Sequence, residues 1–312
     1  MIETNRPFSP DWTSPPGDTI SDILEERGWT QVELADRLGY TPKHVSQLIN
    51  GKATITDDTA VRLERVLGSS ASFWLTREAQ YRAKRAELDE RKRLEGWSSW
   101  CSSLPLKELM SADAIAKRPL NSANMVSTCA DLLQFFRVAS PTEWTRRYAA
   151  METDYRRASS EKADVGALSA WLRLGEIQAE SQDSPPYDRA RFEQKLREIR
   201  NLFVHKPTGL EREIRSLCSD AGVALAVVPE IAHAQVKCAA RWLNPHRPLI
   251  QVSDDQVVTG DFRYAFFHEA AHILLHDKKA VFLDNFAHKS ASSDEESQAD
   301  QWANHFLAQA VR

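Results

Sequence analysis

Apolar residues in the first third of the chain recur every three or four positions, in short stretches closed by glycine or asparagine. This spacing predicts a series of short helices between residues 18 and 67. Polar side chains suited to helix N-caps stand at Asp18 or Thr19, Thr30, Thr41 and Thr56. A longer, highly charged helix is predicted over about 72–94, and the proline-rich stretch 1–17 predicts an extended arm.

The pattern changes in the rest of the chain. Between residues 96 and 220, helical segments are interrupted by prolines, and large apolar residues are candidate core positions: Trp144, Tyr148, Trp171, Leu172 and Leu174. After Gly222, the runs 223–228, 239–243 and 248–252 are short and rich in β-formers, so they predict strands. Helical spacing returns over 264–275 and 295–307, which makes the last third a predicted small α+β unit.

The composition is that of a globular protein, with 42% hydrophobic and 27% charged residues among 312. Because the net charge is -4, contact with DNA would have to come from a local surface. No apolar run is long enough to span a bilayer, and the N-terminus lacks the pattern of a signal peptide. We therefore expect a cytoplasmic protein with no membrane partner and with reduced thiols at Cys101, Cys129, Cys218 and Cys238.

Residues 31–38, a turn at 39–40 and residues 42–49 have the lengths of a helix-turn-helix motif. The first helix is expected to bury Val32, Leu34, Ala35 and Leu38, and the second to bury Val45, Leu48 and Ile49. The polar residues left to hold phosphates or read base edges are Gln31, Thr41, Lys43, His44, Ser46 and Gln47. The alternative is a three-helix packing unit whose polar face is simply solvated.

Four sequence runs in this region can be compared with known families. They are GWTQVELADRLG at 28–39, SQLINGK at 46–52, ITDDTAVRL at 55–63 and FWL at 73–75. Together they closely resemble the HigA-like branch of XRE-family regulators, over about residues 17–85. The resemblance implies operator binding as a homodimer, often to repress the protein's own operon. Phe73 and Trp74 are then expected to belong to the scaffold rather than to contact DNA.

The run HEAAH at 268–272 lies within an apolar helical segment. In a helix, His268 and His272 are about 6 Å apart along the axis and roughly 40° apart around it, so both imidazoles can bind one zinc ion. Glu269 follows the first histidine and can serve as the general base that takes a proton from water in a hydrolysis. A helix that merely buries its histidines is the alternative.

Such a site needs a third ligand. His276 would lie about 12 Å along the helix from His268, one turn too far to share the ion. Glu296 in the predicted helix 295–307 can complete a site of two histidines and one glutamate, with Glu295 as the fallback ligand.

Two residues near Glu296 bear on its role. Ser293 stands three positions before it, so the pair also fits a capping box, in which Glu296 would be structural. Asp300, one turn after Glu296, could orient a ligating histidine through its second ring nitrogen.

Three stretches around these residues are the run FRYAFFHEAAHILLH at 262–276, the downstream pattern ExxADxWA at 296–303 and the upstream run ARWLNP at 240–245. Together they resemble the ImmA/IrrE metallopeptidase family, over about residues 195–308. The resemblance implies zinc held by His268, His272 and Glu296, with Glu269 as the general base, and a repressor protein as substrate. Trp302 stands where the family usually has phenylalanine. The chain ends at Arg312, before the proline-containing segment usual in the family, and from this we expect weak or absent peptidase activity, with the metal ligands unaffected.

We therefore expect a mainly α protein. Its predicted parts are an arm at 1–17, an all-α helix-turn-helix domain with a trailing helix at 18–95, a helical connector at 96–194, and a small α+β, gluzincin-like zinc domain at 195–312. The expected function is a DNA-binding regulator whose zinc endopeptidase domain cleaves or senses a protein partner, either a repressor or a toxin-antitoxin component. The alternative is a HigA-like antitoxin whose zinc domain does not hydrolyse peptides.

Two further features of the predicted zinc domain stay open. Arg241, Tyr264 and His276 are all candidates for stabilising an oxyanion during peptide hydrolysis. The predicted strand 240–243 could bind an extended substrate peptide by pairing with it as an edge strand.

Overall fold

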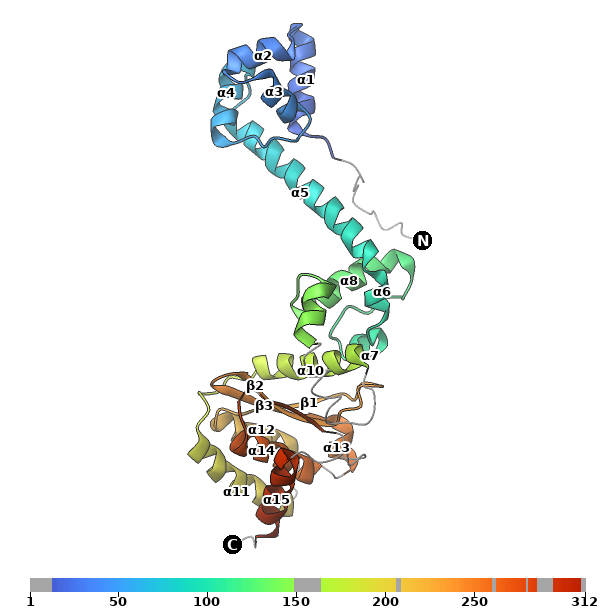
Figure 1. Ribbon diagram of the computed structural model, residues 1–312, viewed down its shortest axis with the longest axis vertical. Coiled ribbons are helices and arrows are strands. Elements are labelled where there is room, and N and C mark those ends of the chain that lie inside the picture. Colours follow the sequence, from blue (N-terminus) through green and yellow to red (C-terminus); the bar gives the residue numbers. More distant parts are fainter. Residues whose placement is uncertain are drawn as a thin grey trace. The chain divides into compact units, whose positions relative to one another are not determined.

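The computed structural model describes residues 13–148, 164–205, 209–259, 262–278, 280–284 and 294–309 (Figure 1). The chain forms two compact units, Met1–Gly96 and Trp97–Arg312. Secondary structure in the described residues is mainly helical, with a small sheet confined to the second unit, which confirms the predicted fold class. No helix among these residues combines the length and apolar character needed to cross a membrane.

From residue 13 onward, the secondary structure of the first unit is entirely helical. Its helices are α1 (Pro16–Arg27), α2 (Gln31–Leu38), α3 (Pro42–Ile49), α4 (Asp57–Leu67) and α5 (Ala71–Gly96). The predicted N-caps at Thr30, Thr41 and Thr56 are confirmed, because each hydroxyl accepts a hydrogen bond from the backbone N–H three residues later.

The predicted cap of the first helix at Asp18 or Thr19 is wrong. Helix α1 begins earlier, at Pro16, and its capping position is held by Pro15, which makes no side-chain cap. Proline suits the first turn of a helix because its fixed φ is already helical and its missing N–H would have no partner there. The predicted arm at 1–17 therefore ends in helical residues, and residues 1–12 lie outside the described part of the chain.

The core of the first unit joins α1 to the helix-turn-helix pair and α4. Its buried residues include Leu34, Ala35 and Leu38 of α2 and Val45 and Leu48 of α3, as predicted, while Ile49 packs on it half-buried. Val32 was predicted to be buried and is instead 56% exposed. At 100° per residue it lies roughly 110° from the mean direction of the other three α2 residues, outside their apolar stripe.

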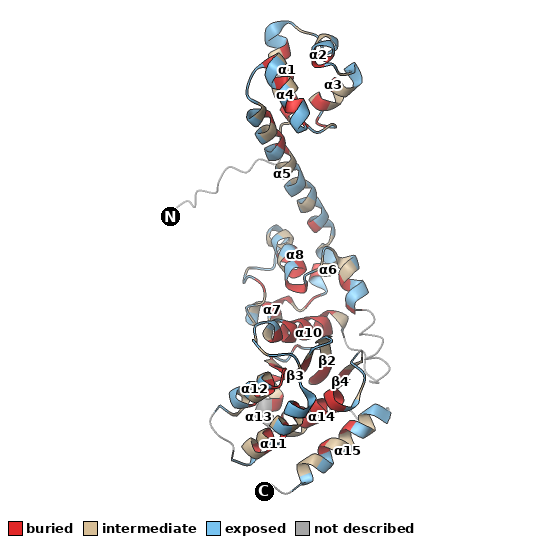
Figure 2. Cartoon of the chain, turned by 90° about the vertical axis from the view of Figure 1, so that its left-hand side faces the viewer, coloured by how far each residue is buried: buried red, intermediate tan, exposed pale blue. Residues whose placement is uncertain are grey.

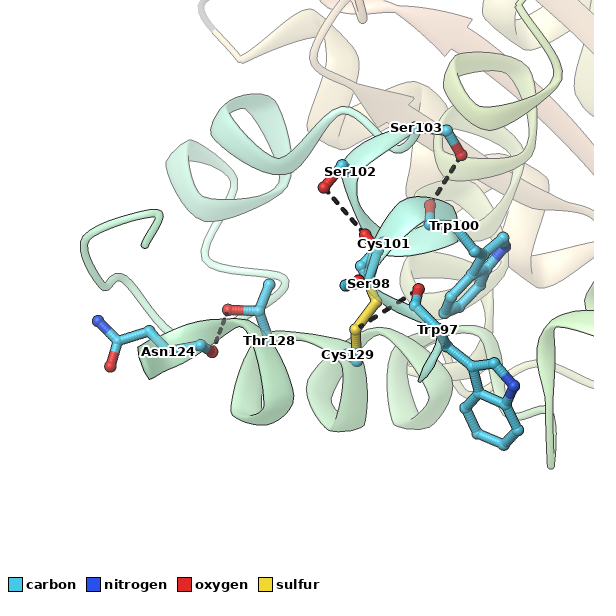
Figure 3. The surroundings of a disulfide bond; sticks show 9 residues. All are labelled: Trp97, Ser98, Trp100, Cys101, Ser102, Ser103, Asn124, Thr128 and Cys129. Atoms are coloured by element: carbon cyan, nitrogen blue, oxygen red, sulfur yellow. Dashed lines mark hydrogen bonds between the residues drawn. A yellow bond between two sulfur atoms is a disulfide. The ribbon is translucent and has the colours of Figure 1, made fainter. Parts of the chain in front are cut away.

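The second unit begins with three helices: α6 (Ser98–Ser102), α7 (Leu106–Ser111) and α8 (Ser122–Phe136). Cys101 of α6 and Cys129 of α8 form a disulfide, with their Cα atoms 5.6 Å apart (Figure 3). The prediction of four reduced thiols is therefore wrong for this pair, because a separation of 28 residues gave no sign that the packing of α6 on α8 would bring them together. Cys218 and Cys238 are buried and lie outside this disulfide.

The sheet contains β1 (Ala224–Val228), β2 (Cys238–Asn244), β3 (Arg247–Ser253) and β4 (Val281–Asp284), in the order β1-β3-β2-β4. Strand β1 pairs with β3 in parallel, and β2 pairs antiparallel with both β3 and β4. Strand β4 was not predicted. Since it covers the outer side of β2, the prediction that 240–243 offers a free edge to a substrate peptide is wrong.

Helices cover both faces of this sheet. Helix α10 (Val165–Glu180) lies on one face and α14 (Phe262–Leu275) on the other, as both views show (Figures 1 and 2). Four further helices are α11 (Arg189–His205), α12 (Leu210–Asp220), α13 (Asp254–Thr259) and α15 (Asp294–Ala308), and residues 141–148 are helical as well. The predicted core residues Trp144, Tyr148, Trp171, Leu172 and Leu174 are all buried.

The α10 face is unusually polar for a sheet interior. Gln251 of β3 is fully buried there, and its side-chain amide donates to the carbonyl oxygen of Trp171 at 2.6 Å. A Cβ atom at Gly175 would collide with this amide, so glycine at that position is what lets α10 approach the sheet. On the α14 face the packing is apolar and joins α11, α12 and α14 to the strands.

Candidate functional site

Three predicted metal ligands converge between α14 and α15. The Nε2 atoms of His268 and His272 are 3.0 Å apart, as expected for side chains one turn apart on a helix. Oε2 of Glu296, from the first turn of α15, lies 3.2 Å from Nε2 of His268 and 3.5 Å from Nε2 of His272. One ligand atom from each residue thus falls within 4.8 Å of the others, and we call these three residues the metal cluster.

The donor set of the metal cluster fits zinc. Ligand atoms around a tetrahedral zinc ion with bonds of about 2.0–2.1 Å lie roughly 3.3–3.4 Å from one another. The three distances in the cluster are close to this spacing. Two imidazole nitrogens and one carboxylate oxygen are also the ligand types that leave a fourth position open in zinc sites.

The outer ring nitrogens of both histidines face polar groups. Oδ1 of Asp300, on α15, lies 3.0 Å from Nδ1 of His268, and the Tyr264 hydroxyl donates to the same Asp300 oxygen at 2.6 Å. Nδ1 of His272 lies 3.0 Å from Nδ1 of His276. Such outer contacts fix the orientation of an imidazole and the nitrogen that carries its proton.

Charge and burial act in opposite directions on Glu296. Burial alone would raise the pKa of its carboxyl group, but hydrogen bonding to His268 and His272 holds that pKa well below its usual range. The carboxylate is therefore ionised and able to bind a cation. For His276, burial and the neighbouring His272 both lower the pKa, so its imidazole favours the neutral form.

The metal cluster is enclosed on the sheet side. The ring of Phe282, on β4, stacks on His272 with centroids 3.9 Å apart and an interplanar angle of 19°. Glu269, the predicted general base, lies between the two histidines in α14 and is 0% exposed. Sequence reasoning missed Phe282 because β4 itself was missed, although the run VFL at 281–283 is a short apolar signal for a strand.

Three further residues were considered for the zinc domain: Glu295, Ser293 and Arg241. Glu295, the fallback ligand, is exposed and outside the metal cluster, and Ser293 of the proposed capping box lies outside the described residues. Arg241 cannot stabilise an oxyanion at the metal cluster. Its side chain points to the α10 face of the sheet, where Nη1 lies 3.0 Å from Oε1 of Glu176. Period-two alternation along β2 decides this, since Ala240 takes the α14 face.

The predicted DNA-binding residues lie on the surface of α2 and α3. Gln31, Thr41 and Lys43 are exposed, and His44, Ser46 and Gln47 are half-buried. Thr41 has a structural task as well, because its hydroxyl accepts from the His44 N–H at 3.2 Å as the cap of α3. The His44 ring contacts Tyr40 edge-on, at 4.7 Å between centroids, which limits how far the ring can turn toward DNA.

Helix α3 therefore carries the exposed Lys43 in its first turn and the half-buried Gln47 one turn later, on a well-packed helix pair. This is the arrangement in which a second helix reads base edges in the major groove.

Of the two predicted scaffold residues, Trp74 is fully buried and its indole N–H donates to the Gly68 carbonyl oxygen, whereas Phe73 is 39% exposed.

The first unit is a helix-turn-helix DNA-binding domain. The family described as Helix-turn-helix matches residues 20–74, and the chain belongs to this family. It is 35% identical over 72 residues to the uncharacterized HTH-type transcriptional regulator YddM of Escherichia coli (strain K12), an alignment that covers 23% of this chain and 77% of that relative.

Two further similarities are of the same extent. Virulence-associated protein I of Dichelobacter nodosus is 33% identical over 76 residues, which is 24% of this chain and 70% of that protein. A solved structure of an addiction module antidote protein of a HigA family from Coxiella burnetii is 29% identical, covering 26% of this chain and 89% of its own, with a TM-score of 0.24.

Proposed function

We propose that this protein is a transcriptional regulator that binds operator DNA through α3 and carries a zinc-dependent endopeptidase in its second unit. The observation that carries the peptidase part is the convergence of His268, His272 and Glu296 at the spacing of tetrahedral zinc ligands. The DNA-binding part is supported by the family match and by the partly exposed polar face of α3. We further propose that the regulator acts as a homodimer, since a dimer would let two copies of α3 contact two half-sites.

The proposed reaction is hydrolysis of a peptide bond in a protein partner, a repressor or a toxin-antitoxin component. Zinc bound by these ligands would polarise the scissile carbonyl group and lower the pKa of a water molecule. Glu269 accepts the proton of the attacking water and returns it to the leaving amine. Asp300 and His276 act through the histidines that they contact, by holding the two imidazoles in the orientation that ligation requires.

A second candidate is an antitoxin-type autorepressor in which the metal cluster binds zinc without hydrolysis. The burial of Glu269 favours it, because a general base must come within hydrogen-bond reach of its water molecule and substrate. The stacking of Phe282 on His272 points the same way, since it encloses the cluster on the sheet side. In this case zinc would stabilise or switch the second unit.

The experiment that separates the two candidates compares the full chain with Glu269→Gln, His272→Ala and Glu295→Gln. Each protein is analysed for zinc by elemental mass spectrometry and is then incubated with the proteins encoded beside its gene, whose intact masses are recorded. We expect about one zinc per chain in the wild type, in Glu269→Gln and in Glu295→Gln, and little in His272→Ala. Cleavage is expected from the wild type and Glu295→Gln only.

The exposed Glu295 provides the control, and Glu295→Gln is expected to behave as wild type. General-base assistance is worth roughly 10²–10⁴-fold in rate, so Glu269→Gln would lose cleavage almost entirely. Full zinc content in His272→Ala would refute the metal cluster. Zinc binding without cleavage by any of the four proteins would favour the non-hydrolytic autorepressor.

A further inference from the structure

The second unit contains a cavity of about 440 Å³ that none of the functions above uses. It lies on the α10 face of the sheet, between the C-terminal half of α10, the turn that joins β2 to β3, and the start of β4. Its volume is in the range of cavities that hold small molecules. The metal cluster lies at the opposite face of the sheet, on α14 and α15, so the cavity is a separate site.

Positive charge is in excess around this cavity. Glu176 is contacted by three guanidinium groups, those of Arg173 at 2.7 Å, Arg241 at 3.0 Å and Arg147 at 3.5 Å. Each ion pair would balance one charge, so a single buried carboxylate leaves the group as a whole positive.

Glu180 does not remove the excess. It pairs with Arg137 at 2.8 Å and also with Arg173, while the side chain of Arg247 lines the cavity and donates to backbone carbonyl oxygens instead of to a carboxylate. Within the described part of the chain, five guanidinium groups thus stand against two carboxylates. Uncompensated charge next to a buried ion pair is costly and is relieved by a bound counter-ion.

Two lining arginines also have unused hydrogen-bonding capacity. The side chain of Arg241 is 3% exposed, and its Nε atom has no hydrogen-bond partner among the described residues. The same holds for the buried Nε atom of Arg247. Both guanidinium groups line the cavity, and a guanidinium group binds carboxylate and phosphate through paired N–H donors, so the cavity suits an oxyanion.

The wall opposite the charges is apolar. The side chains of Leu243 from β2 and Val281 from β4 line it, whereas the Trp242 ring packs against Tyr187 on the other face of the sheet. An inorganic ion would leave this wall in contact with water, whereas an organic anion would bury it. We therefore propose that the cavity binds a small organic anion, with its carboxylate or phosphate group against Arg147 and Arg241 and its apolar part against Leu243 and Val281.

Strand β4 connects this cavity to the metal cluster. Val281, which lines the cavity, pairs with Arg241, and the next residue, Phe282, turns to the other face and stacks on His272. A ligand that shifts β4 would also move the Phe282 ring, which stacks on the proposed metal ligand His272. If the proposed zinc site holds, anion and zinc then change each other's affinity by the same factor; the anion site itself does not depend on zinc.

Titration calorimetry on the metal-free full chain, in a buffer without phosphate or carboxylate, tests the anion site independently of the peptidase proposal. The probes are benzoate, phenyl phosphate, inorganic phosphate and the neutral benzamide. We expect saturable binding of one aryl anion per chain, with benzoate and phenyl phosphate deciding between a carboxylate and a phosphate ligand. Benzamide and inorganic phosphate are expected to bind much more weakly, because each lacks one of the two recognised parts.

Variants locate the binding. Arg147→Gln, at a half-exposed position where folding is not at risk, is expected to weaken binding about tenfold, as loss of one charge-assisted contact does. Val281→Thr, which keeps the shape of the side chain but adds a hydroxyl to the apolar wall, is expected to weaken it too. Arg189→Gln, at an exposed arginine in a surface pair with Glu193, is the matched control.

Three outcomes would overturn the proposal. One is the absence of saturable binding of both aryl anions at concentrations on the order of 10 mM. Another is benzamide or inorganic phosphate binding as tightly as the aryl anions. The third is affinity unchanged in both Arg147→Gln and Val281→Thr.

Discussion

The carboxylate of Asp300 lies 3.0 Å from Nδ1 of His268, on the side of the imidazole away from the metal cluster. Asp300 follows Glu296 by one helical turn, so one face of α15 supplies both a metal-cluster oxygen and the group that orients its neighbour. The Tyr264 hydroxyl, from α14, holds the same carboxylate in place. Helices α14 and α15 are thus joined by a chain of polar contacts that ends at the metal cluster.

Removing the charge of Asp300 is therefore expected to weaken zinc binding although Asp300 is not a ligand. In Asp300→Asn the His268 Nδ1–H loses its carboxylate partner, and changes of this kind typically cost 10–100-fold in metal affinity. Competition with a chromogenic zinc chelator measures the effect. Asp294→Asn, at the exposed start of the same helix, serves as the control. Equal zinc affinity in Asp300→Asn and wild type would show that the contact has no orienting role.

The stability of the metal-free protein should depend on pH through Glu296. Burial would raise the pKa of this carboxyl group, but its hydrogen bonds with His268 and His272 lower that pKa below its usual range. A lowered pKa stabilises the folded state at pH values above the ordinary carboxyl value of about 4.3, and this stabilisation is lost as the pH falls toward the folded-state pKa.

The free energy of unfolding of wild type and Glu296→Gln, from urea denaturation, checks this. We expect the variant to be less stable at about pH 6 and the difference to shrink at about pH 3.5. Glu295→Gln, exposed on the same helix, should change little at either pH. A difference that is absent at the higher pH, or larger at the lower one, would contradict the arrangement.

Lys43 and Gln47 on α3 should affect DNA binding in different ways. Loss of a base contact in Gln47→Ala is expected to cost about 1–3 kcal/mol on the cognate operator and to relax sequence preference at one position. Lys43→Gln is expected to weaken binding to all sequences alike and to reduce the salt dependence by about one counter-ion. Fluorescence anisotropy with operator and scrambled duplexes at several salt concentrations measures both effects.

A matched control for the lysine is Lys92→Gln, the same exchange at an exposed position on α5. Unchanged operator affinity in the double variant Lys43→Gln and Gln47→Ala would remove the reading role from α3. Weakening of equal size by Lys92→Gln would mean that only the overall charge of the unit matters.

Thr41 should contribute to stability in addition to any contact with DNA. Thr41→Ala removes the acceptor for the His44 N–H and is expected to destabilise the first unit by about 1 kcal/mol, as loss of an N-cap does. Thr41→Ser keeps the hydroxyl and should keep most of that stability. Urea denaturation followed by circular dichroism measures both variants, and equal stability of the alanine and serine proteins would contradict a capping role.

The local features of this protein could be derived from its sequence. Thr30, Thr41 and Thr56 cap their helices because a hydroxyl can reach the N–H three residues later without help from the rest of the fold. His268 and His272 meet for a similar reason, since one helical turn places them side by side. The same short-range periodicity predicted most of the helix-turn-helix core.

Only the tertiary structure decided which distant segments meet. It places Glu296 rather than Glu295 beside the histidines, stacks Phe282 of β4 on His272, and joins Cys101 to Cys129. It also places β2 inside the sheet and turns Arg241 toward Glu176 on the α10 face, away from the metal cluster. These relationships depend on strand order and on helix packing between segments that are tens of residues apart, so no spacing along the chain encodes them. A helical or alternating pattern specifies which side of an element is buried, but not the partner that covers it.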